Sequence, residues 1–409
     1  MFLFSVIFKL YFFIIAINAN SSIIKKRFEV KTNSKRSIQE KKYFENNFSE
    51  RNNLVDSIRE KRKIRINLYN WTLPISYHVK FPLNFGLISS ALRILEKNTC
   101  LRFQGRKYFI PNQSGICYAF SSECSSFVGK EHKNNWQFIK ISKPCYNIGG
   151  ILHETLHALG LFHEQCRPDR NSYVEVNENE LGENYKGNCD KVYSYELFDY
   201  ILPYDYGSIM HYGVFSFSKS GQKTLIPKFP FYENTIGHLE RLSFNDIKVL
   251  NLHYCSDKCM NYIYCKNDGY QNPNNCNVCK CIEGFSGVHC EKYARPLRNC
   301  QQTEIAVTKN SKYLRIYGKK YCIYHLKSSQ TKRILIKISK IRMNYPIFYT
   351  CKFANTFEVK YFIDKSTTGA RFCGNINRKY ILSHNNYIIL YYRSLNHESF
   401  VNIYFKEIN

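Results

Sequence analysis

The spacing of apolar side chains changes several times along the 409-residue chain, and each change predicts a different element. Residues 66–81, INLYNWTLPISYHVKF, place β-branched and aromatic residues around Pro74, which predicts strand, turn and strand. Apolar side chains then recur at helical spacing in residues 87–100, which predicts a helix. A further strand is expected at Cys100-Leu-Arg-Phe.

Helical spacing returns twice further along the chain. It begins at Asn147, which stands where an N-cap is expected, and runs into HETLHALGLFHEQ. It appears again in residues 243–255, where Ser243 or Asn245 could cap a last helix. Between Arg170 and that helix we expect loops with one or two short helices.

The last third of the chain has two other patterns. Residues 259–290 carry six cysteines and no core-sized apolar run, so this segment must be stapled by disulfides to fold. From Cys300 onward five strand-like runs separated by turn residues predict a small all-β sandwich: YLRIYG, RILIKIS, TFEVKYFI, YIILYYR and VNIYFK.

The amino-terminal residues predict processing. Residues 1–19 form a short apolar run interrupted by Lys9, which favours a removable secretion signal over a membrane anchor. Residues 20–62 are polar and end in Arg59-Glu-Lys-Arg62, which suits a pro-segment cut by a processing protease; a disordered linker with a solvated charge cluster is the alternative. No later stretch is long and apolar enough to span a bilayer, so no membrane span is expected after signal removal.

Composition agrees with secretion to the extracellular space. Seventeen cysteines suit an oxidising compartment, and sequons begin at Asn47, Asn70 and Asn112. The net charge of +27 is spread along the chain, so we expect no nucleic-acid partner. A basic surface with affinity for acidic matrix or anionic substrates is the better interpretation.

The segment HETLHALGLFHEQ carries the chemistry. On a helix, His153 and His157 share one face and can supply two imidazole ligands to zinc. Gly160 can turn the chain in the left-handed region, so that His163 returns as a third ligand. Three protein ligands leave an open position, which marks a catalytic ion, and Glu154 lies where it can reach a zinc-bound water. An amphipathic core helix with satisfied histidines is the alternative.

This motif predicts a methionine turn downstream, and Met210 supplies it in Ser208-Ile-Met-His-Tyr. Together, HETLHALGLFHEQCRPDR and YDYGSIMHY resemble the astacin family of zinc metallopeptidases, within the metzincins. The flanking stretches NTCLRF, SSFVG, FSFSKSG and LSFNDIKVLNLHY are similar to the same family. The resemblance covers roughly residues 63–255.

The resemblance implies specific roles. His153, His157 and His163 would bind one catalytic Zn²⁺, and Glu154 would be the general base. Tyr212 would be a fifth ligand that swings away and donates a hydrogen bond to the oxyanion. Two neighbours would support the site: Met210 packs beneath it, and Glu164 holds the new amino terminus after processing.

The fold class implied is α+β. An astacin-like peptidase domain at 63–256, with an N-terminal twisted sheet and an active-site helix, would precede an EGF-like module at 257–291 and a CUB sandwich at 300–409. This order is typical of nematode secreted astacins. The implied disulfides are Cys100–Cys255, Cys124–Cys145, Cys259–Cys276, Cys265–Cys279, Cys281–Cys290, Cys300–Cys322 and Cys351–Cys373.

Three features depart from the family or stay open. No F-x-G-D motif precedes Arg62, so the latency mechanism is not defined. Cys117, Cys166 and Cys189 remain, and three cysteines cannot all pair among themselves; Cys166 is expected to be half of a disulfide rather than a regulatory thiol. Lys223 or Lys228 could favour an acidic substrate residue, although two solvated lysines is the plainer interpretation. The acidic residues near 351–364 are too few to favour a calcium site.

The resemblance therefore implies a secreted zinc endopeptidase acting on collagen, cuticle or other extracellular-matrix proteins. The alternative is a catalytically silent matrix- or protein-binding chain that acts through its EGF and CUB modules.

Overall fold

A computed structural model describes residues 64–65, 69–193, 197–198, 200–297, 299–300, 302–344 and 349–409. All of these belong to one compact unit, which spans Glu60–Asn409. The expected signal at 1–19, the pro-segment at 20–62 and the sequon at Asn47 lie outside the described residues. Across the described part of the chain, no helix combines the length and the apolar character needed to cross a membrane.

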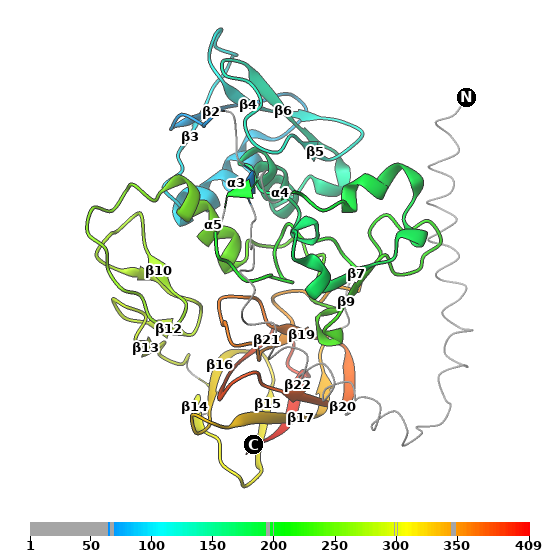
Figure 1. The fold of residues 1–409 in the computed structure, drawn as a ribbon, viewed down its shortest axis with the longest axis vertical. Coiled ribbons are helices and arrows are strands. Elements are labelled where there is room, and N and C mark those ends of the chain that lie inside the picture. The colour runs from blue at the N-terminus through cyan, green and yellow to red at the C-terminus, as the bar shows by residue number, and fades with distance from the viewer. Residues whose placement is uncertain are drawn as a thin grey trace. The chain divides into compact units, whose positions relative to one another are not determined.

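A five-stranded sheet with helix α3 beside it forms the first part of the fold (Figure 1). The strand order is β3-β2-β4-β6-β5, with parallel pairing except between β5 and β6. The expected strand at Cys100 begins only at Phe103, because Thr99 still caps α3 through its N–H and Cys100 is bonded to Cys255. The elements are β2 (Ile75–Val79), α3 (Phe85–Asn98), β3 (Phe103–Gly105), β4 (Gly115–Phe120), β5 (Ser125–Ser126) and β6 (Trp136–Ile141).

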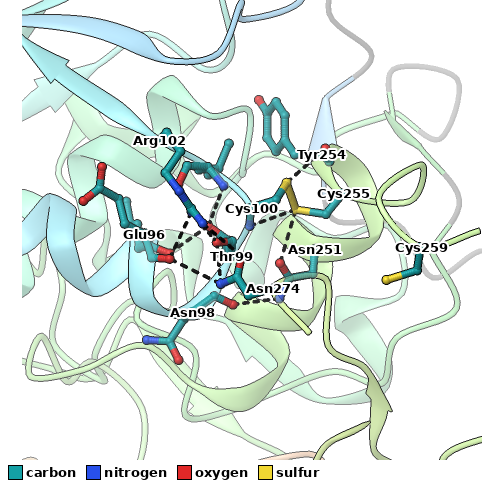
Figure 2. Close-up of a disulfide and its surroundings, with 12 residues drawn as sticks. Glu96, Asn98, Thr99, Cys100, Arg102, Asn251, Tyr254, Cys255, Cys259 and Asn274 are labelled. Carbon is teal, nitrogen blue, oxygen red and sulfur yellow. Dashed lines mark hydrogen bonds between the residues drawn. A yellow bond between two sulfur atoms is a disulfide. The ribbon is translucent and has the colours of Figure 1, made fainter. Parts of the chain in front are cut away.

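Two further helices complete the core of this region. Helix α4 (Ile148–Ala158) packs on α3, and α5 (Phe244–Tyr254) closes the region. Of the two candidate caps for α5, the structure uses Ser243, whose hydroxyl accepts a hydrogen bond from the N–H of Asp246 at 3.0 Å. The disulfide Cys100–Cys255 joins the segment after α3 to the end of α5 (Figure 2). Nearby, the Asn251 amide donates to the carbonyl of Asn98 at 3.0 Å.

The chain between α4 and α5 is mostly loop, as expected, but holds more short 3₁₀ helices than the one or two predicted. Strands of this stretch form two small sheets: β8 (Leu197–Phe198) pairs with β1 (Ile64–Arg65), from earlier in the chain, and β7 (Val174–Val176) pairs with β9 (Leu225–Pro227). The 3₁₀ helices, with one before α4, are η1 (Lys143–Cys145), η2 (Glu164–Cys166), η3 (Arg170–Ser172), η4 (Glu178–Glu180), η5 (Glu183–Cys189) and η7 (Pro230–Tyr232).

Residues 259–290 are held by three disulfides around two small hairpins. The bonds are Cys259–Cys276, Cys265–Cys279 and Cys281–Cys290. The hairpins pair β10 (Tyr270–Gln271) with β11 (Cys279–Lys280) and β12 (Phe285–Ser286) with β13 (Lys292–Tyr293). Little regular structure is present, so the disulfides must supply much of the order.

The remaining residues form two sheets with one apolar core between them. The strand orders are β14-β16-β21-β18-β19 and β15-β22-β17-β20. Alternation along β17 buries Ile334, Ile336 and Ile338, as expected for a strand with one face inward. The strands are β14 (Glu304–Ala306), β15 (Lys312–Tyr317), β16 (Lys320–Lys327), β17 (Arg333–Arg342), β18 (Thr356–Lys360), β19 (Ala370–Phe372), β20 (Asn375–Leu382), β21 (Tyr387–Ser394) and β22 (Phe400–Ile408).

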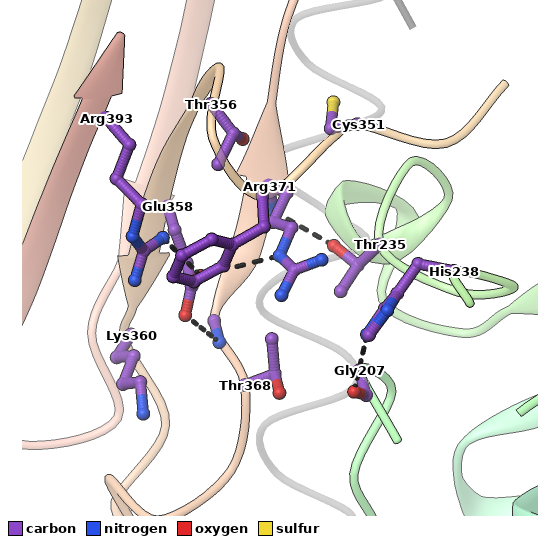
Figure 3. A network of polar contacts seen from close by, with 12 residues as sticks. Gly207, Thr235, His238, Cys351, Thr356, Glu358, Lys360, Thr368, Arg371 and Arg393 are labelled. Carbon is purple, nitrogen blue, oxygen red and sulfur yellow. Dashed lines mark hydrogen bonds and ion pairs between the residues drawn. The ribbon is translucent and has the colours of Figure 1, made fainter. Parts of the chain in front are cut away.

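Strand β19 and the loop that precedes it also contact the loops before α5 (Figure 3). The N–H of Arg371 donates to the Thr235 hydroxyl at 2.9 Å, and the N–H of Thr368 donates to the Asp205 carboxylate at 2.9 Å. The sandwich therefore adds polar partners to the region that follows the histidine motif.

Candidate metal centre and catalytic site

Helix α4 is the scaffold of the site. Its first turn is capped by Asn147, whose side chain accepts from the N–H of Gly150 at 3.0 Å. Gly149 allows a close approach, since a Cβ there would lie 1.7 Å from the carbonyl oxygen of Leu239. The helix ends before Gly160, which adopts φ 99°, a left-handed conformation that turns the chain toward His163.

The three histidines converge as the motif predicts. The Nε2 atom of His163 lies 3.1 Å from that of His157 and 3.3 Å from that of His153. The opposite ring nitrogens of two of them face backbone carbonyls: Nδ1 of His153 is 2.8 Å from the oxygen of Ile209, and Nδ1 of His157 is 2.7 Å from that of Leu161. Protonation at Nδ1 leaves the Nε2 lone pair available to a metal.

The histidines are also held in the neutral form that metals need. Burial lowers the pKa of His153, and it lowers that of His157 to about 3 with a further contribution from His153. Burial and the neighbouring rings lower the pKa of His163 as well. Three neutral imidazoles whose ligand atoms lie within 4.8 Å of one another fit a zinc ion.

Glu154 lies next to the first histidine and is almost fully buried, at 5% exposed. Its Oε2 accepts no hydrogen bond from any described residue. Burial therefore raises the pKa of this carboxyl to about 8. A buried carboxylate that is not satisfied by the protein is suited to exchange a proton with a reacting water.

The methionine turn lies beneath the histidines, and Met210 is fully buried. Asp246 holds the turn: its carboxylate accepts from the Ser208 hydroxyl at 2.6 Å and from the N–H of Ile209 at 2.9 Å. The carbonyl of Ile209 in turn faces His153. The sequence did not reveal this role of Asp246, although its place in the cap of α5 was a usable signal.

Tyr212 lies beside the third histidine, with ring centroids 4.2 Å apart from His163. Its N–H donates to the Gln165 side chain at 3.0 Å, a contact that the sequence did not predict. Burial, followed by the nearby Cys166, Cys189 and Glu154, raises the pKa of its hydroxyl above the usual range. The phenol therefore stays protonated and can act as a hydrogen-bond donor.

Glu164 is fully buried behind the third histidine. Its Oε1 accepts from the N–H of Asp205 at 2.9 Å and from Arg167 at 3.3 Å. Its predicted partner, an amino terminus at residue 63, lies outside the described residues. The described chain starts close by in sequence, where the N–H of Arg65 donates to the carbonyl of Gly160 at 2.8 Å.

Lys223 does not present a free charge, because its ammonium pairs with Glu233 at 2.5 Å. The structure contains seven disulfides among the described residues, in the pairings that the resemblance implies. Cys117, Cys166 and Cys189 are buried and form no disulfide with any described residue.

An α+β domain with this histidine motif and methionine turn defines a class, the zinc metallopeptidases. Residues 63–255 match the family model described as Astacin, a peptidase family. These residues therefore form a domain of the astacin family of zinc metallopeptidases.

Individual relatives agree with this membership. The chain is 31% identical to zinc metalloproteinase nas-34 of Caenorhabditis elegans, over 85% of this chain and 58% of the relative. It is 35% identical to zinc metalloproteinase nas-36 of Brugia malayi, over 73% of this chain and 52% of the relative. The chain thus spans little more than half the length of these relatives.

Among solved structures, part of this chain is similar to high choriolytic enzyme 1, a hatching enzyme zinc-protease from Oryzias latipes. It is 30% identical, with a TM-score of 0.41, and the match covers 46% of this chain and 98% of that one.

Proposed function

We propose that this chain is a secreted zinc-dependent endopeptidase that cleaves extracellular-matrix or cuticle proteins. The observation that carries the proposal is the convergence of three neutral imidazole nitrogens beside the unsatisfied carboxyl of Glu154. If the histidine cluster had only a structural role, the buried carboxyl group without a hydrogen-bond donor would serve no purpose there, because burying such a group lowers the stability of the fold.

Each residue has a chemical role in this proposal. His153, His157 and His163 would hold zinc, which when bound supplies a Lewis acid that polarises a carbonyl and acidifies water. Glu154 takes a proton from the attacking water and returns it to the leaving amine. Tyr212 donates a hydrogen bond to the oxyanion that develops at the scissile carbonyl.

Processing and location extend the proposal. A signal at 1–19 and a pro-segment at 20–62 would be removed, and Glu164 would then hold the new amino terminus. The seven disulfides support an oxidising, extracellular location, and the sequons at Asn70 and Asn112 would carry glycans. We assign residues 63–256 to the peptidase, 257–291 to an EGF-like module and 300–409 to a CUB domain, both for contacting protein substrates.

The test uses residues 63–409 with an authentic amino terminus, as wild type, Glu154→Gln and the exposed control Glu175→Gln. We expect one zinc ion per chain in all three, measured by atomic absorption. Gelatin cleavage should occur only in the wild type and the control, should stop with a chelator, and should return with zinc.

Two outcomes would count against the proposal. Full cleavage by Glu154→Gln would remove Glu154 from its role. Zinc binding without cleavage of gelatin or casein by the wild type would favour a silent binding protein that acts through its C-terminal modules.

A further inference from the structure

Three cysteines of the peptidase region are left over after seven disulfides, and the fold separates them into two groups. Cys117 lies at the middle of β4, fully buried, with its backbone paired to His78 on one side and Phe138 on the other. Cys166 and Cys189 end two short 3₁₀ helices, η2 and η5, which pack against each other.

Backbone and side-chain contacts join the segments around Cys166 and Cys189. The Cys166 thiol donates to the carbonyl of Asn188, the residue directly before Cys189, at 3.4 Å. The carbonyl of Cys166 accepts from the N–H of Val192 at 2.8 Å. The Arg170 guanidinium donates from one nitrogen to the carbonyls of both Gln165 and Cys189. These contacts hold the Cys166 thiol next to the backbone of Asn188 and Cys189.

Cys189 is also unusual within its own segment. Among residues 183–193, all of which the structure describes, its side chain is the only buried one. The Tyr185 ring also holds this segment, because it stacks on Phe217 with centroids 4.4 Å apart. An otherwise exposed polar segment with so little apolar burial gains little stability from packing, so a covalent attachment would matter.

We propose that Cys166 and Cys189 form an eighth disulfide, which fixes the segment 183–193 as a wall beside Tyr212, and that Cys117 stays reduced. In forming this bond the two thiols lose two protons and two electrons. A small-molecule disulfide such as oxidised glutathione accepts them by exchange and leaves as two thiols.

The burial of both thiols supports a structural bond over a reactive thiol. Burial, followed by the neighbouring Cys189, raises the pKa of the Cys166 thiol to about 12, and burial raises that of Cys189. Thiols held protonated in this way are poor nucleophiles, so the bond would form during folding, before the segment closes.

The position of the pair gives the bond a consequence for the site. Cys166 is three residues after His163, and Gln165, directly before Cys166, accepts a hydrogen bond from the N–H of Tyr212 at 3.0 Å. Phe217, on which Tyr185 stacks, contacts the Tyr212 ring with centroids 5.1 Å apart. Segment 183–193 is thus linked to Tyr212 through Phe217, and the bond would also attach it next to Gln165, which contacts Tyr212.

The decisive experiment is mass spectrometry of the full secreted chain, alkylated under denaturing conditions without reduction. Cleavage after glutamate isolates Cys166 in fragment 165–175 and Cys189 in fragment 184–196, each without another cysteine. We expect these two fragments linked and Cys117 alkylated. Alkylation of both Cys166 and Cys189, or a link from Cys117 to either, would overturn the proposal.

Cysteine variants test whether the bond stabilises the fold and supports substrate binding. Thiol alkylation, Tm and KM are measured, so the test does not depend on whether gelatin is cleaved. Cys166→Ser and Cys189→Ser should each leave one newly alkylated thiol and lower Tm by roughly 5–10 °C, and the double variant should match either single one. The control Cys117→Ala should keep the linked fragments. Loss of the bond should raise KM for a peptide substrate several-fold; an unchanged KM would contradict the wall beside Tyr212 even if the bond itself is found.

Discussion

Two carboxyl groups, Glu154 on α4 and Glu358 on β18, are both buried, but their pKa values are shifted in opposite directions. Both are nearly inaccessible, at 5% and 2% exposed. Burial raises the pKa of Glu154 to about 8. Burial also acts to raise the pKa of Glu358, but Arg393 and Arg371 outweigh it and lower that pKa to about 2.

The difference lies in the partners that each carboxylate has. Both oxygens of Glu358 are satisfied: one accepts from the N–H of Gly369 at 2.9 Å, and the other from Arg393 at 2.9 Å and Arg371 at 3.4 Å (Figure 3). Glu154 has an oxygen that no described residue satisfies. A carboxylate with complete partners supports the fold, whereas one left without them is available to a substrate.

The strongest test exchanges each carboxylate for its amide. Glu358→Gln should lower the free energy of unfolding by about 3–5 kcal/mol, because it leaves the buried guanidinium of Arg371 without its paired carboxylate and leaves Arg393 with only the exposed Glu283. Glu154→Gln should leave stability unchanged or raise it, since it removes a carboxylate that burial destabilises. Urea unfolding of both variants measures the change in the free energy of unfolding. Equal losses in the two variants would contradict the difference between the two carboxyl groups.

Two tyrosines, the partly buried Tyr212 and the fully buried Tyr391, extend the same comparison to catalysis. Tyr212→Phe should lower kcat by roughly 10²–10³-fold with little change in Tm, as expected on removal of one oxyanion donor. Tyr391→Phe is the matched control, because its hydroxyl donates to the carbonyl of Glu283 at 2.7 Å within the C-terminal part. It should leave kcat unchanged; a similar fall in kcat for both variants would contradict the assignment of Tyr212.

Acid should separate the two carboxylates as well. The folded pKa of Glu358 is lowered from 4.5 to about 2, so its contribution is fully present above about pH 4.5 and is lost as pH falls toward 2. The size of this contribution is on the order of 3 kcal/mol. Unfolding curves of wild type and Glu358→Gln between pH 6 and 2 should therefore converge at low pH. If the difference in stability between the two proteins stayed constant across this pH range, the ion pairs of Glu358 would not be its cause.

The smallest expected effect concerns the scaffold of the site. Asn147→Ala removes the side-chain cap of α4 and should cost about 1 kcal/mol of stability. Zinc content should stay at one ion per chain, because the histidines lie further along the helix. Thermal unfolding with parallel metal analysis measures both, and loss of zinc without loss of stability would place Asn147 in the site itself.

Local sequence alone was sufficient for the elements that have strong periodicity. Helices α3 and α5 follow their apolar spacing, and Gly160 ends α4 where the motif needs a turn. The histidine spacing, i and i+4 plus a return after Gly160, is a property of a few neighbouring residues, which explains why the motif alone indicated the site. The strand β20 was missed because its sequence, NINRKYIL, has polar or charged residues at four of its first five positions and is mostly exposed.

Tertiary structure decided what depends on residues far apart in the chain. The support of the methionine turn by Asp246 joins residues 37 positions apart, and the pairing of Glu358 with Arg393 joins residues 35 apart. The proposed bond between Cys166 and Cys189 likewise rests on the packing of η2 against η5, which are distant in sequence. Sequence spacing determines which residues share a helix face. Contacts between residues far apart in the chain depend on how the helices, strands and loops pack together, and a local sequence pattern does not specify this packing.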